Sequence, residues 1–401
     1  MSLSSLVVYN NQQPVGLLSK EGRNAHSFSY RDHYRDNSQA TAVSLTMPVR
    51  NRSYDYEGLH PVFSQNLPEG YLKEVIAKTV SKIHGSDSLA LLAVLGPYQM
   101  GRLHYQAEGQ PPPDGDDTSE SISDLLSGDN PGLFDELVEK YALRSGISGV
   151  QPKVLLTVSD KALVRSGKLI VKAWGDDYPQ LAFNEYLSMQ VAADAGLKVP
   201  VCDVSADGRL FLMERFDINP EGGYLGFEDG CTLQGYLPEQ KYDSTYERLA
   251  KTVAAFVSPE HKRQAMEALF LSVLVSWAVR NGDAHLKNFG LLYDYPEGAC
   301  WMSPTFDIVC TTCYLPNDVP ALQLGGSKRW WSPKQLASFA TVHCGLAPRD
   351  VSRMMQQVAQ ALRQGLVNID TMIEQHPQFA EVGQAMQAQW RQSSSSLRAQ
   401  P

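Results

Sequence analysis

Two aspartates and an asparagine are spaced as in enzymes that transfer phosphoryl groups. Asp283 and Asn288 lie five positions apart in the segment 281–288 (NGDAHLKN), and Asp307 follows after Phe306. Protein kinases use this Asp-to-Asn spacing in their catalytic loop, where the first Asp orients the attacking hydroxyl and the Asn and a later Asp hold Mg²⁺ against ATP. We therefore expect Asp283 to be a catalytic base, with Asn288 and Asp307 as magnesium ligands.

A buried helix and a strand pair are expected to position these residues. The segment 265–279 (AMEALFLSVLVSWAV) is apolar all round, which predicts a buried helix. Residues 289–293 (FGLLY) and 299–302 flank a turn signal, which predicts a hairpin. The three oxygen-bearing side chains would then converge on one hard cation. In the alternative interpretation, Asp283 only caps a turn and Asn288 only starts a strand.

Kinase chemistry also needs groups that hold the phosphates, and these are sought upstream. Segment 145–153 (SGISGVQPK) is rich in small residues, which let backbone N–H groups approach phosphate oxygens. Segment 169–173 (LIVKA) predicts a strand that carries Lys172, and segment 181–195 predicts a helix that carries Glu185 as its partner. The alternatives are a plain connecting loop and a lysine that reaches to the surface.

The next predicted strand is in the position of a kinase hinge. Segment 210–216 (LFLMERF) predicts a strand that is followed by Asp217. In a two-lobed kinase, backbone groups at this point hold adenine, which makes Glu214, Arg215 and Phe216 candidates for that role. The alternative for Phe216 is an ordinary core position.

Composition and charge are those of an ordinary globular protein. The chain has 401 residues, and 43% hydrophobic residues suffice for a large core in about two or three domains. A net charge of −9 argues against global attraction to nucleic acid or to an anionic membrane. No basic region precedes an apolar stretch at the N-terminus, so we expect no membrane contact and a cytoplasmic location. Cys310 and Cys313 form a C-x-x-C without a second ligand pair, and we expect reduced thiols.

The chain divides into five expected parts. The fold class predicted is α+β: a two-lobed protein-kinase-like fold with a small β-rich N-terminal subdomain and a mainly helical C-terminal lobe. The parts are the N-terminal subdomain at 1–105, a Pro-, Gly- and Asp-rich linker at 106–131, a lobe with the phosphate loop and hinge at 132–238, a helical lobe with the catalytic loop at 239–392, and a disordered tail at 393–401. A helix is expected over 71–84 within the first part.

Four motifs, in this order, resemble those of the HipA-type serine/threonine kinases, the toxins of bacterial HipA–HipB toxin–antitoxin pairs. The motifs are 148–153 (SGVQPK), 214–217 (ERFD), 281–288 (NGDAHLKN) and 306–308 (FDI). The N-terminal segments 15–17, 26–28 and 66–69 (NLPE) resemble the family's small N-terminal subdomain. The resemblance therefore covers nearly the whole chain.

This resemblance implies an ATP- and Mg²⁺-dependent serine/threonine protein kinase with assigned site residues. Asp283 would be the catalytic base, and Asn288 and Asp307 the magnesium ligands. The residues implied to contact the nucleotide are Ser148, Gly149, Val150, Gln151, Pro152, Lys153, Lys172, Glu214, Arg215, Phe216, His285, Leu286, Lys287, Asn288, Phe306 and Asp307.

The resemblance also implies regulation and partners. The family autophosphorylates a serine of the phosphate loop, which ejects the loop. The first candidate position here is Gly146, so we expect Ser148 to be modified, with Ser145 as the second choice. Pro152 stands where the best-known member has an acidic residue, and it removes one N–H donor. The implied partners are an aminoacyl-tRNA synthetase as substrate, a HipB-like antitoxin, and operator DNA only through the antitoxin complex.

Three further interpretations stay open. Segment 328–331 (KRWW) is a basic-aromatic loop that could touch a phosphate backbone, or a surface loop over packed tryptophans. Small-molecule phosphotransferases of the aminoglycoside or choline kinase type share G-D-x-H-x-x-N with residues 282–288, but they usually have an acidic pocket and lack the serine-containing phosphate loop. The third alternative is an inactive regulator that acts through its antitoxin.

Overall fold

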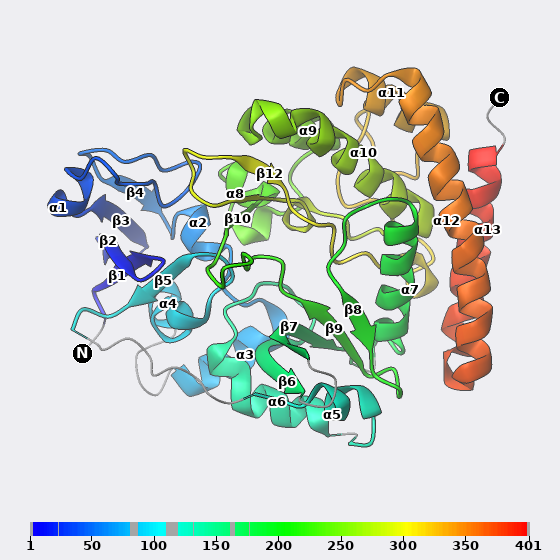
Figure 1. The fold of residues 1–401 in the computed structure, drawn as a ribbon, viewed down its shortest axis with the longest axis horizontal. Coiled ribbons are helices and arrows are strands. Elements are labelled where there is room, and N and C mark those ends of the chain that lie inside the picture. Colours follow the sequence, from blue (N-terminus) through cyan, green and yellow to red (C-terminus); the bar gives the residue numbers. More distant parts are fainter. Residues whose placement is uncertain are drawn as a thin grey trace.

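The computed structural model describes residues 3–22, 24–80, 87–109, 119–130, 132–160, 165–175 and 177–398. Within them the chain builds three antiparallel sheets and a helical C-terminal region (Figure 1). The N-terminal sheet and the helices α12 and α13 lie at opposite ends of the molecule (Figure 1). This arrangement leaves the other two sheets and the loops between them at the centre.

The N-terminal sheet begins with a tight hairpin. Its two-residue turn, Asn11 and Gln12, has positive φ angles of 43° and 71°, as favoured in β-hairpins. The strand order is β4-β3-β2-β1-β5. The strands are β1 Ser5–Asn10, β2 Gln13–Lys20, β3 Ala25–Tyr30, β4 Tyr54–Glu57 and β5 Leu103–Gln106, with the short helices α1 Asp32–Arg35 and α2 Pro61–Ser64.

Helix α4 (Ser88–Leu95) joins this sheet to the next lobe. It is apolar on every side, which fits a helix buried between two layers. Leu89 and Leu92 belong to the core of the N-terminal sheet, whereas Leu91 and Leu95 belong to the core of the following lobe. Helix α3 (Gly70–Val80) adds to the second core as well. The first 105 residues therefore contribute to two cores, their own and that of the lobe behind them. Residues 81–84 of the helix expected at 71–84 lie outside the described residues.

The second lobe is a four-stranded sheet in the order β6-β7-β9-β8. One face packs in a core with α5 and α6, and the other packs against α7. The linker expected at 106–131 contains helix α5. This stretch is ordered because Ile122 and Leu125 are buried in the core of the lobe. Residues 110–118 of that linker lie outside the described residues. The elements are β6 Lys153–Asp160, β7 Arg165–Ala173, β8 Cys202–Val204, β9 Leu210–Glu214, α5 Ile122–Ser127, α6 Leu133–Tyr141 and α7 Leu181–Asp194.

The third part is mainly helical and is organised around α10 (Lys262–Val279). Nearly every side chain of α10 after Gln264 is buried, which confirms the helix predicted from its apolar sequence. A three-stranded sheet, in the order β10-β11-β12, lies beside it. The remaining elements are β10 Gly226–Asp229, β11 Gly290–Tyr293, β12 Cys300–Met302, α8 Gly230–Leu233, α9 Tyr246–Phe256, α11 Pro333–Val342, α12 Pro348–Gln375 and α13 Ala380–Arg398.

The C-terminal end differs from the disordered tail expected at 393–401. Helix α13 continues to Arg398, and Ser393 and Ser394 are buried. The buried positions Met386, Trp390, Ser393 and Leu397 recur every three or four residues, so small serines extend one packed helical stripe. Residues 399–401 lie outside the described residues.

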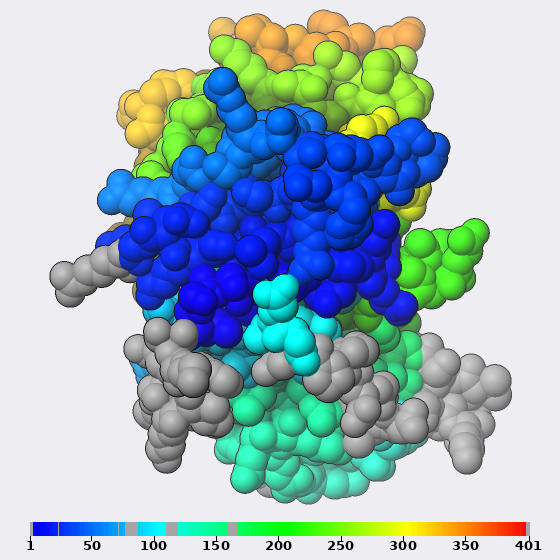
Figure 2. All heavy atoms as spheres, turned by 90° about the vertical axis from the view of Figure 1, so that its left-hand side faces the viewer, coloured from blue at the N-terminus to red at the C-terminus, as the bar shows by residue number. Residues whose placement is uncertain are grey.

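The predicted fold class is confirmed: the chain is α+β with two kinase-like lobes, an N-terminal β-rich subdomain and a mainly helical C-terminal lobe. Figure 2 shows the N-terminal subdomain in blue as a continuous layer over one face, in contact with later segments above and below it. Among the described residues, no helix combines the length and apolar character needed to cross a bilayer.

Candidate functional site

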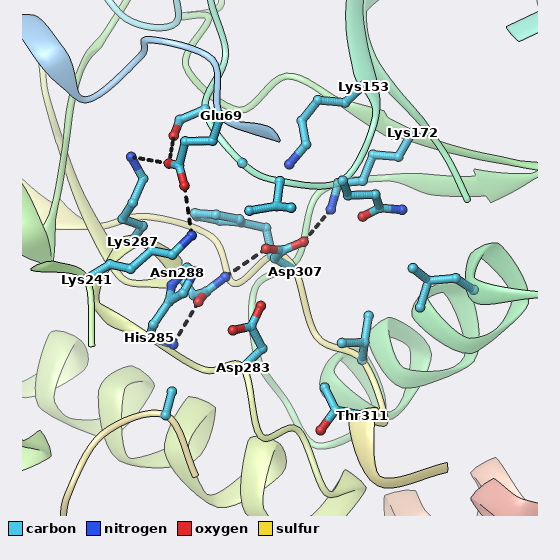
Figure 3. A pocket seen from close by; sticks show the side chains of 18 of the residues that line it. Glu69, Lys153, Lys172, Lys241, Asp283, His285, Lys287, Asn288, Asp307 and Thr311 are labelled. Atoms are coloured by element: carbon cyan, nitrogen blue, oxygen red, sulfur yellow. Dashed lines mark hydrogen bonds and ion pairs between the residues drawn. The ribbon is translucent and has the colours of Figure 1, made fainter. Parts of the chain in front are cut away.

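A cleft of about 880 Å³ lies where the phosphate loop, the catalytic loop and the N-terminal subdomain meet (Figure 3). This volume falls in the range of small-molecule sites, roughly 300–1,000 Å³. Its lining combines apolar side chains with ionisable ones. The cleft therefore has the character of a site for a ligand with an apolar part and a charged part.

The segment expected to be the catalytic loop, residues 280–288, leaves α10 through Arg280. This residue has a left-handed backbone, with φ of 63°. Asn281 then fixes the loop, because its Oδ1 accepts a hydrogen bond of 3.0 Å from the backbone N–H of Asp283. The N–H of Gly282 donates to Thr311 Oγ1 at 2.8 Å, and a side chain at Gly282 would collide with Asp318. The chain adopts this turn because α10 ends at the left-handed Arg280 and because Gly282 has no side chain. The loop thus presents Asp283 to the cleft.

Asp283 is set up as a proton acceptor. Its carboxylate is open to the cleft, but protein surrounds it on the other sides, and this burial raises its pKa to about 6. Tyr242 Oη donates a hydrogen bond of 2.7 Å to Asp283 Oδ1, which acts in the opposite direction. The negative charge of Asp307 raises the pKa further. A carboxylate with a pKa near 6 is suited to general-base catalysis at neutral pH.

Asp307 meets Asn288 and Lys172 at the centre of the cleft (Figure 3). Asn288 Nδ2 donates to Asp307 Oδ2 at 2.8 Å, and Lys172 Nζ donates to Asp307 Oδ1. Burial acts to raise the pKa of Asp307, but the charges of Lys172 and Lys153 outweigh it and hold that pKa well below its usual range. Asp307 has a φ of 62°, a conformation that Asp tolerates better than most residues.

The expected pair between β7 and α7 is present. Lys172 Nζ lies 2.5 Å from Glu185 Oε1, and both side chains are buried. Burial raises the pKa of Glu185. Burial also acts to lower the pKa of Lys172, but the charges of Asp307 and Glu185 raise it overall. Lys172 is therefore a fixed cation that points into the cleft.

The phosphate loop, residues 145–153, folds closely over a second lysine of the cleft, Lys153. Gly149 has a φ of 127°, and a Cβ there would collide with the Nζ of Lys153, so glycine is required. Burial and the charge of Lys172 lower the pKa of Lys153 to about 8. The loop is tied to β7 by a hydrogen bond of 3.1 Å from Gln151 Nε2 to the carbonyl of Ala173. Two cations thus face the same space.

Two phenylalanines of the cleft lining stack on one another, and we call this part of the cleft its apolar end. The rings of Phe216 and Phe306 have centroids 5.1 Å apart at an angle of 24°. Ile170 and Met213, which pair across β7 and β9, also line the cleft. It is a flat, apolar place of the kind that receives an aromatic base.

Not every residue expected at the nucleotide lies in the cleft wall. Glu214, Arg215 and Leu286 are absent from it. The Arg215 guanidinium instead binds Asp217 at 2.6 Å, and the Leu286 side chain is fully buried in the core. All the other residues expected to contact the nucleotide line the cleft.

The donor set fits one cation shared with phosphate groups. Asp307 offers a carboxylate, and Asn288 offers an amide oxygen. This amide oxygen accepts a 2.9 Å hydrogen bond from the backbone N–H of His285. Within the described ranges, no group of three or more His, Cys, Asp or Glu side chains could hold a metal alone. Mg²⁺ commonly binds through one or two protein oxygens and completes its shell with phosphates and water.

Several cleft residues were missed by sequence reasoning. Glu69 comes from the N-terminal subdomain, and Lys241 and Tyr242 come from the loop before α9. The sequence signal for the first was the segment 66–69 (NLPE), which indicated family resemblance but no role. The signals for Lys241 and Tyr242 were absent, because they reach the cleft only through tertiary packing.

The basic-aromatic segment forms part of the cleft wall. Lys328 lines the cleft, and its Nζ donates to the carbonyl of Tyr242 at 3.3 Å. Trp331 is buried, and Trp330 donates to the carbonyl of Asp318. The tryptophans therefore pack beneath the loop. All six cysteines are free thiols.

Comparison with known families matches two regions of the chain. Residues 145–366 match the family described as HipA-like C-terminal domain, and residues 6–106 match the HipA N-terminal domain. The first match spans more than half of the chain and contains Lys172, Asp283 and Asp307.

Individual relatives agree with these matches. The chain is 28% identical to the putative kinase Y4mE of Sinorhizobium fredii, over 90% of this chain and 92% of that protein. It is 28% identical to the serine/threonine-protein kinase toxin HipA of Shewanella oneidensis, over 43% of this chain and 44% of that protein. Among solved structures, the complex of HipA, HipB and operator DNA from Shewanella oneidensis matches with a TM-score of 0.70 and 18% identity, covering 99% of this chain and 100% of that chain.

Proposed function

This chain belongs to the HipA-like family, and from that premise we propose that it is an ATP- and Mg²⁺-dependent serine/threonine protein kinase that acts as a toxin. The observation that carries the proposal is the meeting of Asp283, Asn288, Asp307 and Lys172 in one cleft. These are the groups that phosphoryl transfer needs: a base, ligands for a cation and a fixed positive charge.

Each group has a distinct role in the proposed reaction. Lys172 and Lys153 attract the phosphates of ATP, and Glu185 keeps Lys172 in place. Asp307 and Asn288 would hold Mg²⁺, which would supply positive charge against the phosphates. Asp283 accepts the proton of the acceptor hydroxyl as that oxygen attacks the γ-phosphorus, while the bond from the γ-phosphorus to the β–γ bridging oxygen breaks and ADP leaves.

The apolar end of the cleft is the proposed adenine site. A purine would lie against Phe216 and Phe306, whose rings already stack on one another. The backbone at 214–216 begins at the last residue of β9 and is the proposed hinge contact. The side chain of Arg215 takes no part, because it binds Asp217.

Ser148 is the proposed autophosphorylation site. It lines the cleft, whereas the Ser145 hydroxyl is fully buried, donates to the carbonyl of Tyr141 and accepts from the N–H of Leu155. The γ-phosphoryl group would pass from ATP to Ser148 Oγ with release of ADP. A phosphate in that place would repel those of ATP, because it carries a charge of about −2.

The partners are proposed by likeness to the Shewanella protein, which was solved as a complex with HipB and its operator DNA. We propose a HipB-like antitoxin as partner, and operator DNA contact through that complex. An aminoacyl-tRNA synthetase as the phosphorylated protein stays a prediction of the family resemblance.

The mouth of the cleft favours a polypeptide over a small cationic substrate. Val150, Tyr178, Leu315 and Val319 line the cleft and expose between 41% and 60% of their surface. Exposed apolar side chains around a site are typical of protein contacts. The small-molecule phosphotransferase therefore stays the second candidate.

Incubation with ATP labelled on the γ-phosphate tests the proposal. We expect label on the protein at Ser148 with Mg²⁺, and none with Asp283→Ala. Asp294→Ala, an exposed aspartate in the turn after β11, is the matched control and should behave as the wild type. Label that enters only soluble small molecules would favour the second candidate, and no transfer at all would favour the inactive regulator.

A further inference from the structure

We propose that Glu69, which belongs to the N-terminal subdomain, is a positioning residue of the kinase cleft. It holds the phosphate loop through Ser148, and it directs Lys241 and Lys287 toward the cleft. The proposal rests on the proposed kinase function for its consequence, but its structural part stands on contacts among the protein's own side chains. It gives the first hundred residues a direct role at the site.

The Glu69 carboxylate is the meeting point of three groups. Figure 3 shows two of them, Lys241 and Lys287, directed at this carboxylate. Ser148 Oγ donates to Oε1 at 2.6 Å. Lys241 Nζ lies 2.8 Å from Oε2, and Lys287 Nζ lies 3.4 Å from Oε1. These partners come from the phosphate loop, the loop before α9 and the catalytic loop. One side chain therefore joins all three sides of the cleft.

The backbone around Glu69 is held firmly enough for this task. Gln65 Nε2 donates to the carbonyl of Phe227 at 2.9 Å, and Asn66 Nδ2 donates to the carbonyl of Met100 at 2.7 Å. Gly70 has a φ of 51°, and a Cβ there would lie only 2.8 Å from the carbonyl oxygen of Val150. The phosphate loop thus packs directly on the residue that follows Glu69.

The charges around Glu69 support a role in holding Lys241 and Lys287, beyond the packing of its side chain. Burial acts to raise the pKa of Glu69, but the charge of Lys287 and the hydrogen bonds from Lys241 and Ser148 hold it at about 2. Both lysine side chains are less than 10% exposed. Among the described residues, Glu69 is the only carboxylate within 4 Å of Lys241. Loss of the Glu69 charge would leave that ammonium buried without its counterion.

The consequence for the reaction follows from the position of Ser148. Backbone groups of the loop bind phosphates well only when the loop is held in one conformation. Glu69 supplies a hydrogen bond at the middle of this loop, next to Gly149, which has no side chain to anchor it. Without Glu69 the loop would sample open conformations, and ATP would bind more weakly.

Glu69→Gln tests the proposal, because it keeps the shape and removes the charge. We expect faster amide hydrogen exchange in peptides that cover residues 145–153 and an ATP dissociation constant raised by about fivefold or more. Glu69→Asp keeps the charge on a shorter side chain and should recover part of the affinity. Glu74→Gln changes an exposed glutamate further along α3, and it should match the wild type in both measurements.

A double-mutant cycle with Ser148→Ala isolates the contact. The effect of Glu69→Gln on loop exchange should be smaller in the Ser148→Ala background, because the charge-assisted hydrogen bond that Gln weakens is already absent there. Loop exchange and ATP affinity that match the wild type in Glu69→Gln would overturn the proposal. Exchange is measured without nucleotide, so failure of the wild type to bind ATP would count against the kinase function and not against the role of Glu69 in the loop.

Discussion

The pH dependence of phosphoryl transfer should report the raised pKa of Asp283. The carboxylate is active as a base only when it is deprotonated, so activity should fall as the pH falls through about 6. A pKa of about 6 leaves about 9% of the base form at pH 5 and about 91% at pH 7, a change of about tenfold. With the ordinary value of 3.8 the same interval would change the rate by less than about 10%.

The variant Tyr242→Phe tests the direction in which the pKa of Asp283 should move. The Tyr242 hydroxyl donates to Asp283 and so lowers its pKa, and removal of this donor should move the acid limb to higher pH. A hydrogen bond to a charged group contributes about 1.5 kcal/mol or more. One pKa unit corresponds to about 1.36 kcal/mol. Screening by water in the open cleft reduces the expected shift to about 0.5–1 unit.

The assay is the initial rate of transfer from labelled ATP at limiting ATP concentration, measured from pH 5 to pH 8. The phosphates of ATP titrate equally in all variants, so the difference between the profiles isolates the protein group. Tyr295→Phe, an exposed tyrosine in the turn after β11, is the control and should leave the profile unchanged. An acid limb near pH 4, or one that stays in place in Tyr242→Phe, would refute the assignment of Asp283 as the base.

Three further changes test other parts of the site and fold. Gly149→Ala should weaken ATP binding by about tenfold or more in calorimetry, because φ of 127° and the contact with Lys153 exclude a side chain; unchanged affinity would contradict the loop geometry. Asp307→Asn should reduce Mg²⁺-dependent ATP affinity by about tenfold or more; equal affinity with and without Mg²⁺ in both proteins would remove that metal role. Trp390→Ala should lower the free energy of unfolding by about 3–5 kcal/mol in denaturant titrations, since Trp390 is fully buried against Gly365; a smaller loss would mean that α13 packs loosely.

Local sequence patterns predicted the parts of the site that lie near one another in the chain. The apolar run before Asp283 predicted a buried helix, and the spacing to Asn288 predicted a loop that faces a cation. The strand with Lys172 and the helix with Glu185 are adjacent in sequence, so their pairing could be expected from kinase chemistry alone. These predictions depended on short-range periodicity and on the known needs of phosphate binding.

Contacts between distant segments could not be predicted in this way. Glu69 and Ser148 lie 79 positions apart, and their hydrogen bond depends on how α3 and α4 pack on the second lobe. The polar composition around Ser393 predicts a disordered tail, because it hides a helical stripe whose partners lie in other helices. Arg215 was expected at the nucleotide, but the neighbouring Asp217 binds it instead. Tertiary packing decides each of these cases.

The central claim is that this cleft transfers phosphate to hydroxyl groups of proteins, including its own Ser148. Site-resolved phosphopeptide mass spectrometry after brief induction in cells measures this directly, with Asp283→Ala as the inactive comparison. We expect phosphate on Ser148 and on one partner protein in the wild type, and on neither in Asp283→Ala. Equal phosphopeptide profiles from the two proteins would contradict it.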